Sequence, residues 1–431
     1  MFYRNKKLRA TDYTMSLRLW NSIEDRKKLL RVNSLFQYTF IAAYRRKREL
    51  ELEYNSDDDD DDDNNEQTNR NPYVDPLRVL WVIGYHQRAR VLCPIEDDNI
   101  VFGQTKTINN FTEHECLLYF RFLKDDLIEV ANQLWPRLRI YLNSNDVRRI
   151  EVGNKYIAHY ETCLCAYLFK MSHPCRLIGE VESFFGIRKS KLSQMIRFFG
   201  QALYELAIQY LSNPNIWHHK MPYYALVISN KINGMFDNIW GYIDGTVRKT
   251  CRPMHFQQVL YTRYKRCHAI KFQSVVTPDG YVACLAGPFV GRRHDSRMLR
   301  ESQLVEQLEA LMPEDGSNGT VYTLYGDLAY PQSAYIFGGF VAPDRNSPEA
   351  RFNQAMSRIR IAVEWGFATI LRRWTHLDFT RSMKLFEQPI AQQFINCAFL
   401  VNLQNCFYGG ATNVYFDCNV MSLQVYLQLI D

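Results

Sequence analysis

Acidic residues are scarce in one central stretch of this sequence. Residues 241–300 hold eleven lysines and arginines but only three acids, which are Asp244, Asp279 and Asp295. The whole chain carries a formal charge of only +6, so the excess is local. A basic field around a few carboxylates suits a polyanionic substrate whose cleavage needs a metal ion, because the cations attract phosphates while the acids hold the metal. A merely solvated basic surface is the alternative.

Other absences narrow the class of protein further. The sequence has no glycine-rich phosphate loop and no internal repeat. The N-terminus, MFYRNKKLRA, lacks the pattern of a signal peptide, and the eleven cysteines are an odd number, so we expect an intracellular protein with reduced thiols. We expect no membrane-spanning segment either. Residues 388–416 carry no charge but include eight Gln and Asn, which favours a buried helix followed by a loop.

The N-terminal part of the chain divides by composition into three segments. Residues 1–55 are basic and are expected to form a helical arm ending in the cluster RRKR at 45–48, a candidate nuclear import signal or phosphate contact. Residues 56–72 include seven consecutive aspartates, whose mutual repulsion predicts a disordered acidic linker. Residues 73–155 show helical spacing of apolar side chains, and we assign them no chemistry. The helix at 115–138 is expected to stop at Trp135 and Pro136.

Residues 156–215 have the pattern of a helix-turn-helix. Residues 156–171 predict one apolar helix and residues 176–185 a short second one. Gly186 then turns the chain into a third helix with Ser190 as its N-cap. Five apolar side chains of this third helix fall on one stripe: Leu192, Met195, Ile196, Phe199 and Leu203. The other side is polar and is a candidate DNA-binding surface, made of Lys189, Ser190, Lys191, Ser193, Gln194 and Arg197. A helical bundle with an ordinary polar surface is the alternative.

Cysteines in the same region raise the question of a zinc site. Cys163 and Cys165 are separated by one residue, and His159, His173 and Cys175 lie nearby in the sequence. This spacing matches no standard zinc pattern, and both cysteines fall in an apolar helical run. Buried core thiols are therefore the preferred interpretation.

Two predicted strands end in an aspartate. IWGYIDGT, residues 239–246, contains Asp244, and VYTLYGDLAYP, residues 321–331, contains Asp327. Glu364 follows in a long helical pattern. Asp-Gly is also ordinary turn chemistry, but a carboxylate at the end of a buried strand is a common metal ligand. Two strand-end aspartates and a helical glutamate can converge on a pair of divalent cations, an arrangement that cuts phosphodiesters.

The order of elements in residues 235–408 predicts an α/β domain of the ribonuclease-H-like type, with a mixed sheet flanked by helices and an all-α region before it. Three antiparallel strands are expected first, with a turn at 277–280 between the second and the third. GRRHDSRML then opens a helix that reaches about Met312. Two further strand-like segments and the Glu364 helix follow. In such a sheet the first and fourth strands can lie side by side, which brings Asp244 and Asp327 together. Residues 409–431 are expected to form a C-terminal tail.

Several motifs in this order resemble the DDE endonuclease domain of PIF/Harbinger-type transposases. They are IDGT, YKRCHAIKFQSVVTPDG, GPFVGRRHDSRMLRES, YGDLAYP and VEWGFATILRRW. The upstream SHPCRLIGEVESFFGIRKSKLSQMI is similar to the helix-turn-helix of the same family, so the resemblance covers roughly residues 115–405. It implies that Asp244, Asp327 and Glu364 bind two Mg²⁺ or Mn²⁺ ions and cleave DNA at transposon ends before strand transfer. His294 and Asp295 form a family motif, and Arg292, Arg293 and His294 are candidates to steady the scissile phosphate.

The resemblance also implies partners and a location. Double-stranded DNA would be the substrate, a separate Myb/SANT-like DNA-binding protein would accompany the chain, and a homo-oligomer would assemble on DNA in the nucleus. Two alternatives stay open. One is a domesticated, transposase-derived DNA-binding protein or nuclease without transposition activity, against which the three retained carboxylates count. The other is an enzyme of the same fold that acts on RNA or damaged DNA.

Overall fold

The computed structural model describes residues 106–142, 144, 148–152, 156–174, 180–313 and 319–431. The basic arm expected at 1–55, the acidic linker expected at 56–72 and the first part of the segment 73–155 lie outside these residues. Within the described ranges no helix is long and apolar enough to cross a membrane.

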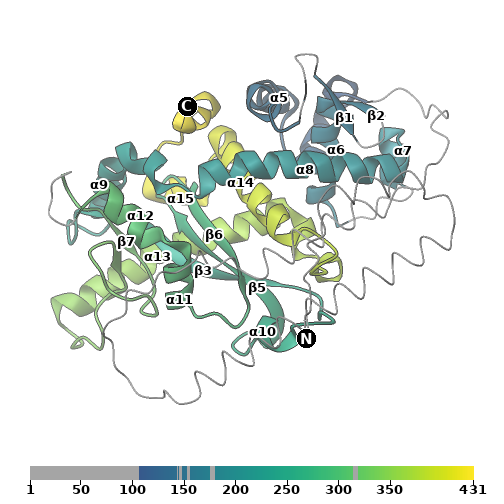
Figure 1. Cartoon of the computed structure of the whole chain (residues 1–431). Coiled ribbons are helices and arrows are strands. Elements are labelled where there is room, and N and C mark those ends of the chain that lie inside the picture. Colours follow the sequence, from purple (N-terminus) through teal and green to yellow (C-terminus); the bar gives the residue numbers. More distant parts are fainter. Residues whose placement is uncertain (1–105, 143, 145–147, 153–155, 175–179, 314–318) are drawn as a thin grey trace, which may run out of the picture. The chain divides into compact units, whose positions relative to one another are not determined.

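A six-stranded mixed sheet forms the centre of the described chain (Figure 1). Its strands are β3 (Ile239–Lys249), β4 (Tyr261–Thr262), β5 (Cys267–Val276), β6 (Val282–Val290), β7 (Thr323–Tyr325) and β8 (Ile336–Phe337). β5 pairs antiparallel with β3, β4 and β6, whereas β7 pairs in parallel with β3 and β8. Strands β3 and β7 correspond to the first and fourth strands of the expected sheet, and they lie side by side as predicted. A separate antiparallel pair consists of β1 (Arg149–Val152) and β2 (Tyr156–His159).

Helices surround this sheet. In chain order the helical segments, including short 3₁₀ and π turns, are η2 (Ile108–Asn110), α4 (Glu113–Glu115), η3 (Cys116–Phe120), α5 (Lys124–Leu138), α6 (Tyr160–Ser172), α7 (Glu180–Phe185), α8 (Lys189–Leu211), η4 (Pro214–Lys220), α9 (Met221–Lys231), α10 (Gln257–Leu260), α11 (Asp295–Ser302), α12 (Leu304–Leu311), α13 (Pro348–Arg373), η5 (Thr375–Asp378), η6 (Thr380–Ser382), α14 (Ile390–Tyr408), α15 (Ala411–Phe416), α16 (Leu423–Leu427) and η7 (Gln428–Ile430). Their buried apolar side chains form one contiguous core from Ile108 to Leu427.

Helices α11 and α13 lie on opposite faces of the sheet. A Cβ at Gly366 of α13 would lie 3.3 Å from Val276, which pairs with Tyr242 in β3. A Cβ at Gly245 would lie 3.1 Å from Asp295 and from Met298, both in α11. Because neighbouring residues of a strand point to opposite faces, Tyr242 and Gly245 mark the two faces. Figure 1 shows α11 in front of the sheet and α13 behind it.

Helix α14 confirms the buried helix expected from the uncharged stretch at 388–416. All its side chains from Ile390 to Asn405 are buried, so its polar side chains need partners inside the protein. Asn396 donates to the Tyr167 hydroxyl and to the Gly200 carbonyl, both at 2.8 Å. Asn402 exchanges two hydrogen bonds of 2.9 Å with the backbone of Val282 in β6. The amides thereby join α14 to α8 and to the sheet.

Several expected helix limits are wrong, each for a local reason. Residues 156–159 form β2, because they pair with β1 before α6 begins. The helix expected at 115–138 breaks at Arg121, which has φ +65°, and α5 then continues through Pro136. Pro136 removes one backbone hydrogen-bond donor, and α5 ends two residues later at Leu138. Helix α8 begins at Lys189 with Arg188 as its N-cap, so Ser190 lies inside the helix.

The helix expected from about 295 to 312 also differs, because it divides in two. Gln303 has φ +55° and separates α11 from α12. This left-handed residue ends the first helix and redirects the chain.

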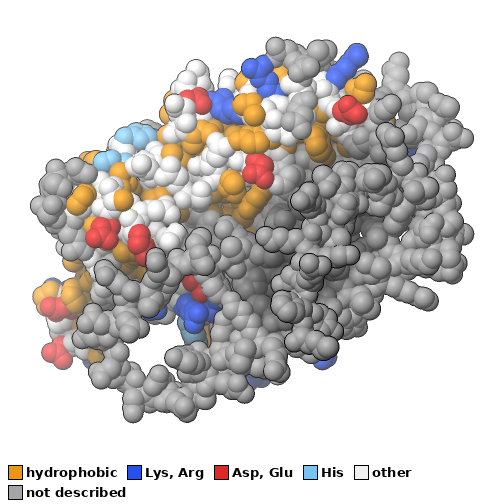
Figure 2. All heavy atoms as spheres, viewed as in Figure 1, with side chains coloured by type: hydrophobic (Ala, Val, Ile, Leu, Met, Phe, Trp, Pro, Cys, Tyr) orange, Lys and Arg blue, Asp and Glu red, His pale blue; other side chains and the backbone are white. Residues whose placement is uncertain are grey.

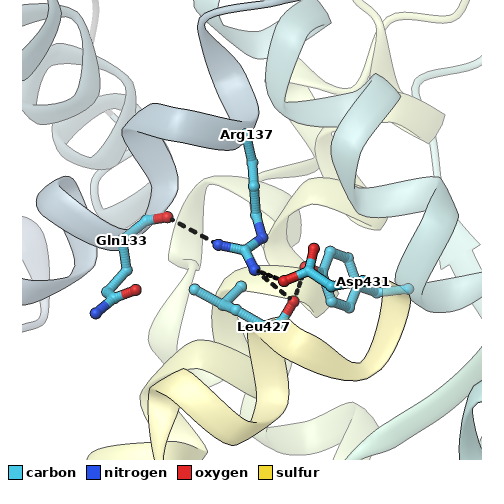
Figure 3. Close-up of polar contacts among 5 residues, drawn as sticks. Gln133, Arg137, Leu427 and Asp431 are labelled. Atoms are coloured by element: carbon cyan, nitrogen blue, oxygen red, sulfur yellow. Dashed lines mark hydrogen bonds and ion pairs between the residues drawn. The ribbon is translucent and has the colours of Figure 1, made fainter.

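The C-terminal segment, expected to be a tail, folds into α15, α16 and η7. Its end packs on α5, where the Arg137 guanidinium donates to the Leu427 carbonyl at 3.0 Å and pairs with Asp431 (Figure 3). The same guanidinium donates to the Gln133 carbonyl at 3.4 Å. Leu423, Tyr426 and Leu427 are buried. Residues before 140 and after 420 thus share one core, which no local sequence pattern indicates.

Candidate active site

Asp244 and Asp327 meet at the same level of two neighbouring strands. In the parallel pair of β3 and β7, Tyr242 lies opposite Tyr325, and an aspartate follows each tyrosine two residues later. In parallel strands, residues at equal distances along the chain from a paired position lie at the same height in the sheet. The charge of Asp327 accordingly contributes to raising the pKa of Asp244. The structure therefore brings together the two aspartates that the expected strand order places side by side.

Gly326 allows the end of β7 to lie close against β3. A side chain there would place its Cβ 2.9 Å from Ile243 Cγ2 and also 2.9 Å from Tyr330 Cδ2, which is closer than carbon atoms pack. The Tyr330 backbone N–H donates to the Asp327 carbonyl at 2.9 Å. This compact turn after β7 holds Asp327 beside β3.

The pKa of the Asp244 carboxyl group lies well above that of an ordinary aspartate. This pKa is raised to about 6, chiefly by burial and to a smaller extent by the nearby charges of Asp295 and Asp327. The Gly245 backbone N–H, which donates to Asp244 Oδ1 at 2.8 Å, and the Arg360 guanidinium oppose this rise. Carboxyl groups with raised pKa values are frequent in sites that bind cations or exchange protons.

Asp295 stands over Gly245, on the other face of the sheet from α13. Its Oδ1 lies 3.4 Å from Lys271 Nζ, and the same ammonium donates to the Arg293 carbonyl at 2.6 Å. The missing side chain at Gly245 leaves room for this approach, since a Cβ there would lie 3.1 Å from Asp295 Oδ1. A carboxylate repels a phosphate, so the pairing of Asp295 with Lys271 fits charge balance better than phosphate contact.

Arg360 of α13 faces Asp327. Its Nη1 lies 3.8 Å from Asp327 Oδ2, with the two side chains 29% and 52% exposed. An ion pair this long and this exposed contributes little to stability. Asp327 Oδ1 accepts from the Leu328 backbone N–H at 2.7 Å, so a backbone amide fixes one carboxylate oxygen and the other faces the arginine.

Glu364 lies one helical turn after Arg360 on the same side of α13, because residues four apart share a helix face. Its side chain is exposed. Among the residues that the structure describes, no group of three or more His, Cys, Asp or Glu side chains could hold a metal ion. A site with all three predicted carboxylates therefore requires Glu364 to approach the two aspartates.

The two aspartates nevertheless fit a hard divalent cation. Carboxylate oxygens are the ligands that Mg²⁺ and Mn²⁺ prefer. Asp244 and Asp327 repel each other in a partly buried setting, and a cation between them would relieve this repulsion. One oxygen of each carboxylate is oriented by a backbone N–H, which leaves the second oxygen of each for another partner.

The residues proposed to contact phosphate differ in their exposure and in the ion pairs they form. Arg293 pairs with Glu301 at 2.9 Å, and the same carboxylate holds Arg297 at 3.1 Å. Figure 2 shows basic and acidic side chains next to each other over α11. Arg292 and His294, by contrast, are exposed, and His294 precedes the first residue of α11. These two are the better placed to meet a substrate.

The polar side of α8 is engaged with its own protein. Of its six candidate residues only Lys189 is exposed, and the other five are partly buried. The Lys191 ammonium lies 5.2 Å from the centroid of the Tyr156 ring, and Arg197 donates to the Ser193 side chain at 3.1 Å. The five apolar residues of the predicted stripe are all buried, as expected. Cys163 and Cys165 are likewise buried with free thiols, in keeping with core residues.

Sequence reasoning missed three side chains near the aspartates, namely Lys271, Tyr330 and Arg360. Tyr330 is 2% exposed, and its hydroxyl, affected by the charges of Asp295 and Asp244, has no hydrogen-bond partner among the described residues. The spacing of Arg360 and Glu364 in one helix was a usable signal. Lys271 and Tyr330 carry no such signal, because only the folded sheet and turn bring them to the aspartates.

Comparison with known proteins adds one finding. Residues 243–402 match the family model of the DDE superfamily endonucleases. The match begins beside Asp244, includes Asp327 and Glu364, and ends within α14. It supports a nuclease domain of the ribonuclease-H-like fold, with which the mixed sheet and its flanking helices agree. Neither a curated protein nor a solved structure matches the chain.

Proposed function

We propose that this chain is a DNA transposase of the PIF/Harbinger type, which cleaves DNA at transposon ends and transfers the strand to a target. The carrying observation is that Asp244 in β3 and Asp327, just beyond β7, each lie two residues after the paired Tyr242 and Tyr325, inside the span that matches DDE endonucleases. The motifs GRRHDSRML and VEWGFATILRRW support the finer family assignment.

In this proposal Asp244, Asp327 and Glu364 are the catalytic carboxylates. Two Mg²⁺ or Mn²⁺ ions held by them would activate a water or a DNA 3′-hydroxyl and neutralise charge on the leaving oxygen. Asp244 is partly buried, and the Gly245 and Leu328 amides orient the two aspartates. Arg292 and His294 steady the scissile phosphate from the start of α11. Attack by water cuts the strand, and attack by the freed 3′-hydroxyl joins it to target DNA.

The proposal includes partners and a place of action. Double-stranded DNA is the substrate, and the six polar residues of α8 are its proposed contacts in a helix-turn-helix. A Myb/SANT-like protein and further copies of this chain would complete the complex on DNA. Because such a complex acts on chromosomal DNA, the proposed location is the nucleus.

A second candidate function is DNA binding without cleavage, in a domesticated descendant of a transposase. One observation favours it: Arg360, rather than Glu364, is the side chain of α13 that faces Asp327. Because the Arg360 guanidinium already faces Asp327, a metal ion is less needed to balance the charge of that carboxylate. The two candidates share the fold and the substrate and differ only in chemistry.

The deciding experiment uses duplexes that carry the inverted repeats flanking the coding region. We expect strand cleavage in Mg²⁺ or Mn²⁺ and none in EDTA. Asp244→Asn, Asp327→Asn and Glu364→Gln should each abolish most cleavage while DNA binding persists, and their losses should not add because they disable one site. Glu306→Gln, at an exposed position of α12, controls for the loss of a charge. DNA binding without metal-dependent cleavage by the wild type would favour the second candidate.

A further inference from the structure

Strands β3 and β5 extend beyond the aspartates as an arm, which β6 accompanies by pairing with β5 as far as Ile270. Asp244 lies opposite Ser274, and the pairing continues to Lys249 and Ala269. The Thr250 backbone N–H then donates to the His268 carbonyl at 2.9 Å. Strand β7 ends at the level of Tyr242 and does not follow the arm. In Figure 1 this end of β5 lies beside α10, below the rest of the sheet.

The arm ends in a hairpin, residues 261–268, which we call the basic hairpin. Tyr261 pairs with His268 and Thr262 with Cys267, which leaves the loop Arg263–Arg266 at the tip. All four loop residues are exposed. They are an arginine, a tyrosine, a lysine and another arginine, so the tip combines three cations with one aromatic ring.

In the part of the chain that the structure describes, the hairpin cations have no acidic partner. The sequence contains no Asp or Glu from Gly245 to Pro278, and no ion pair links Arg263, Lys265 or Arg266 to an acid within the described ranges. Two other cations of the arm do point inward. Arg248 lies 5.6 Å from the centroid of Phe394, and Lys271 pairs with Asp295. The tip therefore presents charge that the fold itself does not use.

Tyr264 is an unusual residue to leave in water. It is 84% exposed, and the Lys265 ammonium lies 4.7 Å from its ring centroid. Tyrosine is enriched at binding interfaces relative to the rest of protein surfaces. A ring next to cations can pack against sugars or unstacked bases while the cations contact phosphates.

We propose that the basic hairpin grips the DNA duplex that flanks the cleavage site. This inference rests on the proposed function, since it takes DNA bound at Asp244 as its starting point. Cys267 lies seven residues before Ser274 on β5, a rise of about 23 Å at roughly 3.3 Å per residue. Duplex DNA rises about 3.4 Å per base pair. In this proposal the duplex runs along the arm, so it would meet the hairpin about seven base pairs from the scissile phosphate.

The first test measures DNA binding in EDTA, where no cleavage step is involved. Arg263→Gln/Arg266→Gln should weaken binding to a duplex about tenfold and lower the salt slope by about two, because two phosphate contacts are lost. Arg263→Lys/Arg266→Lys should keep the slope. The matched control is Arg345→Gln/Arg351→Gln, which removes two exposed arginines near β8, at the other edge of the sheet. Tyr264→Ala should lower affinity with the slope unchanged.

The second test maps where the hairpin lies. A photoreactive phenylalanine analogue in place of Tyr264 should crosslink to the duplex about seven base pairs from the cleavage position. Crosslinking within two base pairs of that position, or none, would overturn the assignment.

The outcomes separate this inference from the proposed function. If the wild type binds no DNA, the proposed function fails. If it binds DNA and the Gln/Gln hairpin variant binds with unchanged affinity and slope, only the hairpin assignment fails. Equal losses in the hairpin variant and the β8-edge control would reduce the effect to net charge and also overturn it. Tighter binding of single-stranded RNA than of duplex DNA would contradict the partner we assign.

Discussion

The sequence predicts a DNA-related function for two regions of this molecule, the aspartate site and the polar side of α8. Their charged side chains have opposite environments in the fold. Around Asp244 it gathers carboxylates of one sign, raising the pKa of Asp244 to about 6 through burial first and neighbouring carboxylates second. On α8 it ties polar side chains to their own protein, as with Lys191 over Tyr156 and Arg197 on Ser193. In the first region Arg360 and the Gly245 N–H offset the repulsion only in part, because the Asp244 pKa stays raised, whereas the polar side chains of the second are largely satisfied.

This difference shows where a partner has most to contribute. A bound cation lowers the free energy of the aspartate pair by relieving repulsion that already exists. A phosphate reaching α8 must instead compete with contacts already formed, except at Lys189, which is exposed. The comparison therefore favours the aspartates as the functional centre. DNA binding by α8 is the weaker hypothesis, because most of its polar side chains would have to give up existing contacts.

The largest expected effect comes from Asp244→Asn in the cleavage assay. Metal-based charge stabilisation is worth several kcal/mol, which corresponds to roughly a thousandfold in rate at about 1.36 kcal/mol per tenfold. DNA affinity in the same variant should stay near that of the wild type. A cleavage rate within tenfold of the wild type would show that Asp244 holds no catalytic metal. The aspartates would then have no stronger claim than α8 to be the functional centre.

The same substitution should change how stability depends on pH. The Asp244 pKa of about 6 lies above its ordinary 3.8, so the folded state keeps a proton that the unfolded state releases in that window. This stabilisation is present below about pH 3.8 and is lost as the pH rises through 6. In EDTA at pH 7, Asp244→Asn should be about 1–3 kcal/mol more stable than the wild type, and the gap should close near pH 4. Urea unfolding across this range measures it, and a gap independent of pH would contradict the raised pKa.

The α8 variant Lys189→Ala/Lys191→Ala/Arg197→Ala is expected to have a smaller effect. If these residues contact phosphates, duplex affinity should fall about tenfold and the salt slope should flatten. Anisotropy titrations at several salt concentrations measure both. Circular dichroism is the needed control, because Lys191 and Arg197 also contact their own protein. A folded variant with unchanged affinity and slope would remove the helix-turn-helix from the proposal.

The sequence predicted well what depends on local pattern. The turn at 277–280, the apolar stripe of α8 and the buried α14 all follow from composition and periodicity. The strand ends expected at Asp244 and Asp327 are wrong: β3 continues past Asp244 to Lys249 because it stays paired with β5, and β7 ends at Tyr325, two residues before Asp327. The sequence also failed where other tertiary contacts decide: β2 is a strand only because β1 pairs with it, and Pro136 is tolerated at the end of α5. At the candidate site it could place Glu364 on a helix. It could not tell that Arg360, one turn earlier, would face Asp327, because that depends on how α13 docks on the sheet.

That docking leads to the smallest expected effect, which concerns Arg360 and metal affinity. Arg360 and a divalent cation compete for Asp327 Oδ2, since the guanidinium lies 3.8 Å from that oxygen. Arg360→Gln should therefore bind Mn²⁺ more tightly in the absence of DNA. The pair is long and partly exposed, so the gain should not exceed about 1 kcal/mol, roughly fivefold in affinity. Calorimetric titration with Mn²⁺ measures it, and Arg358→Gln, an exposed neighbour on the same helix, controls for net charge. Equal affinities in the Arg360→Gln variant and the wild type would show that the arginine does not guard the aspartates. The second candidate function would then lose the observation that favours it.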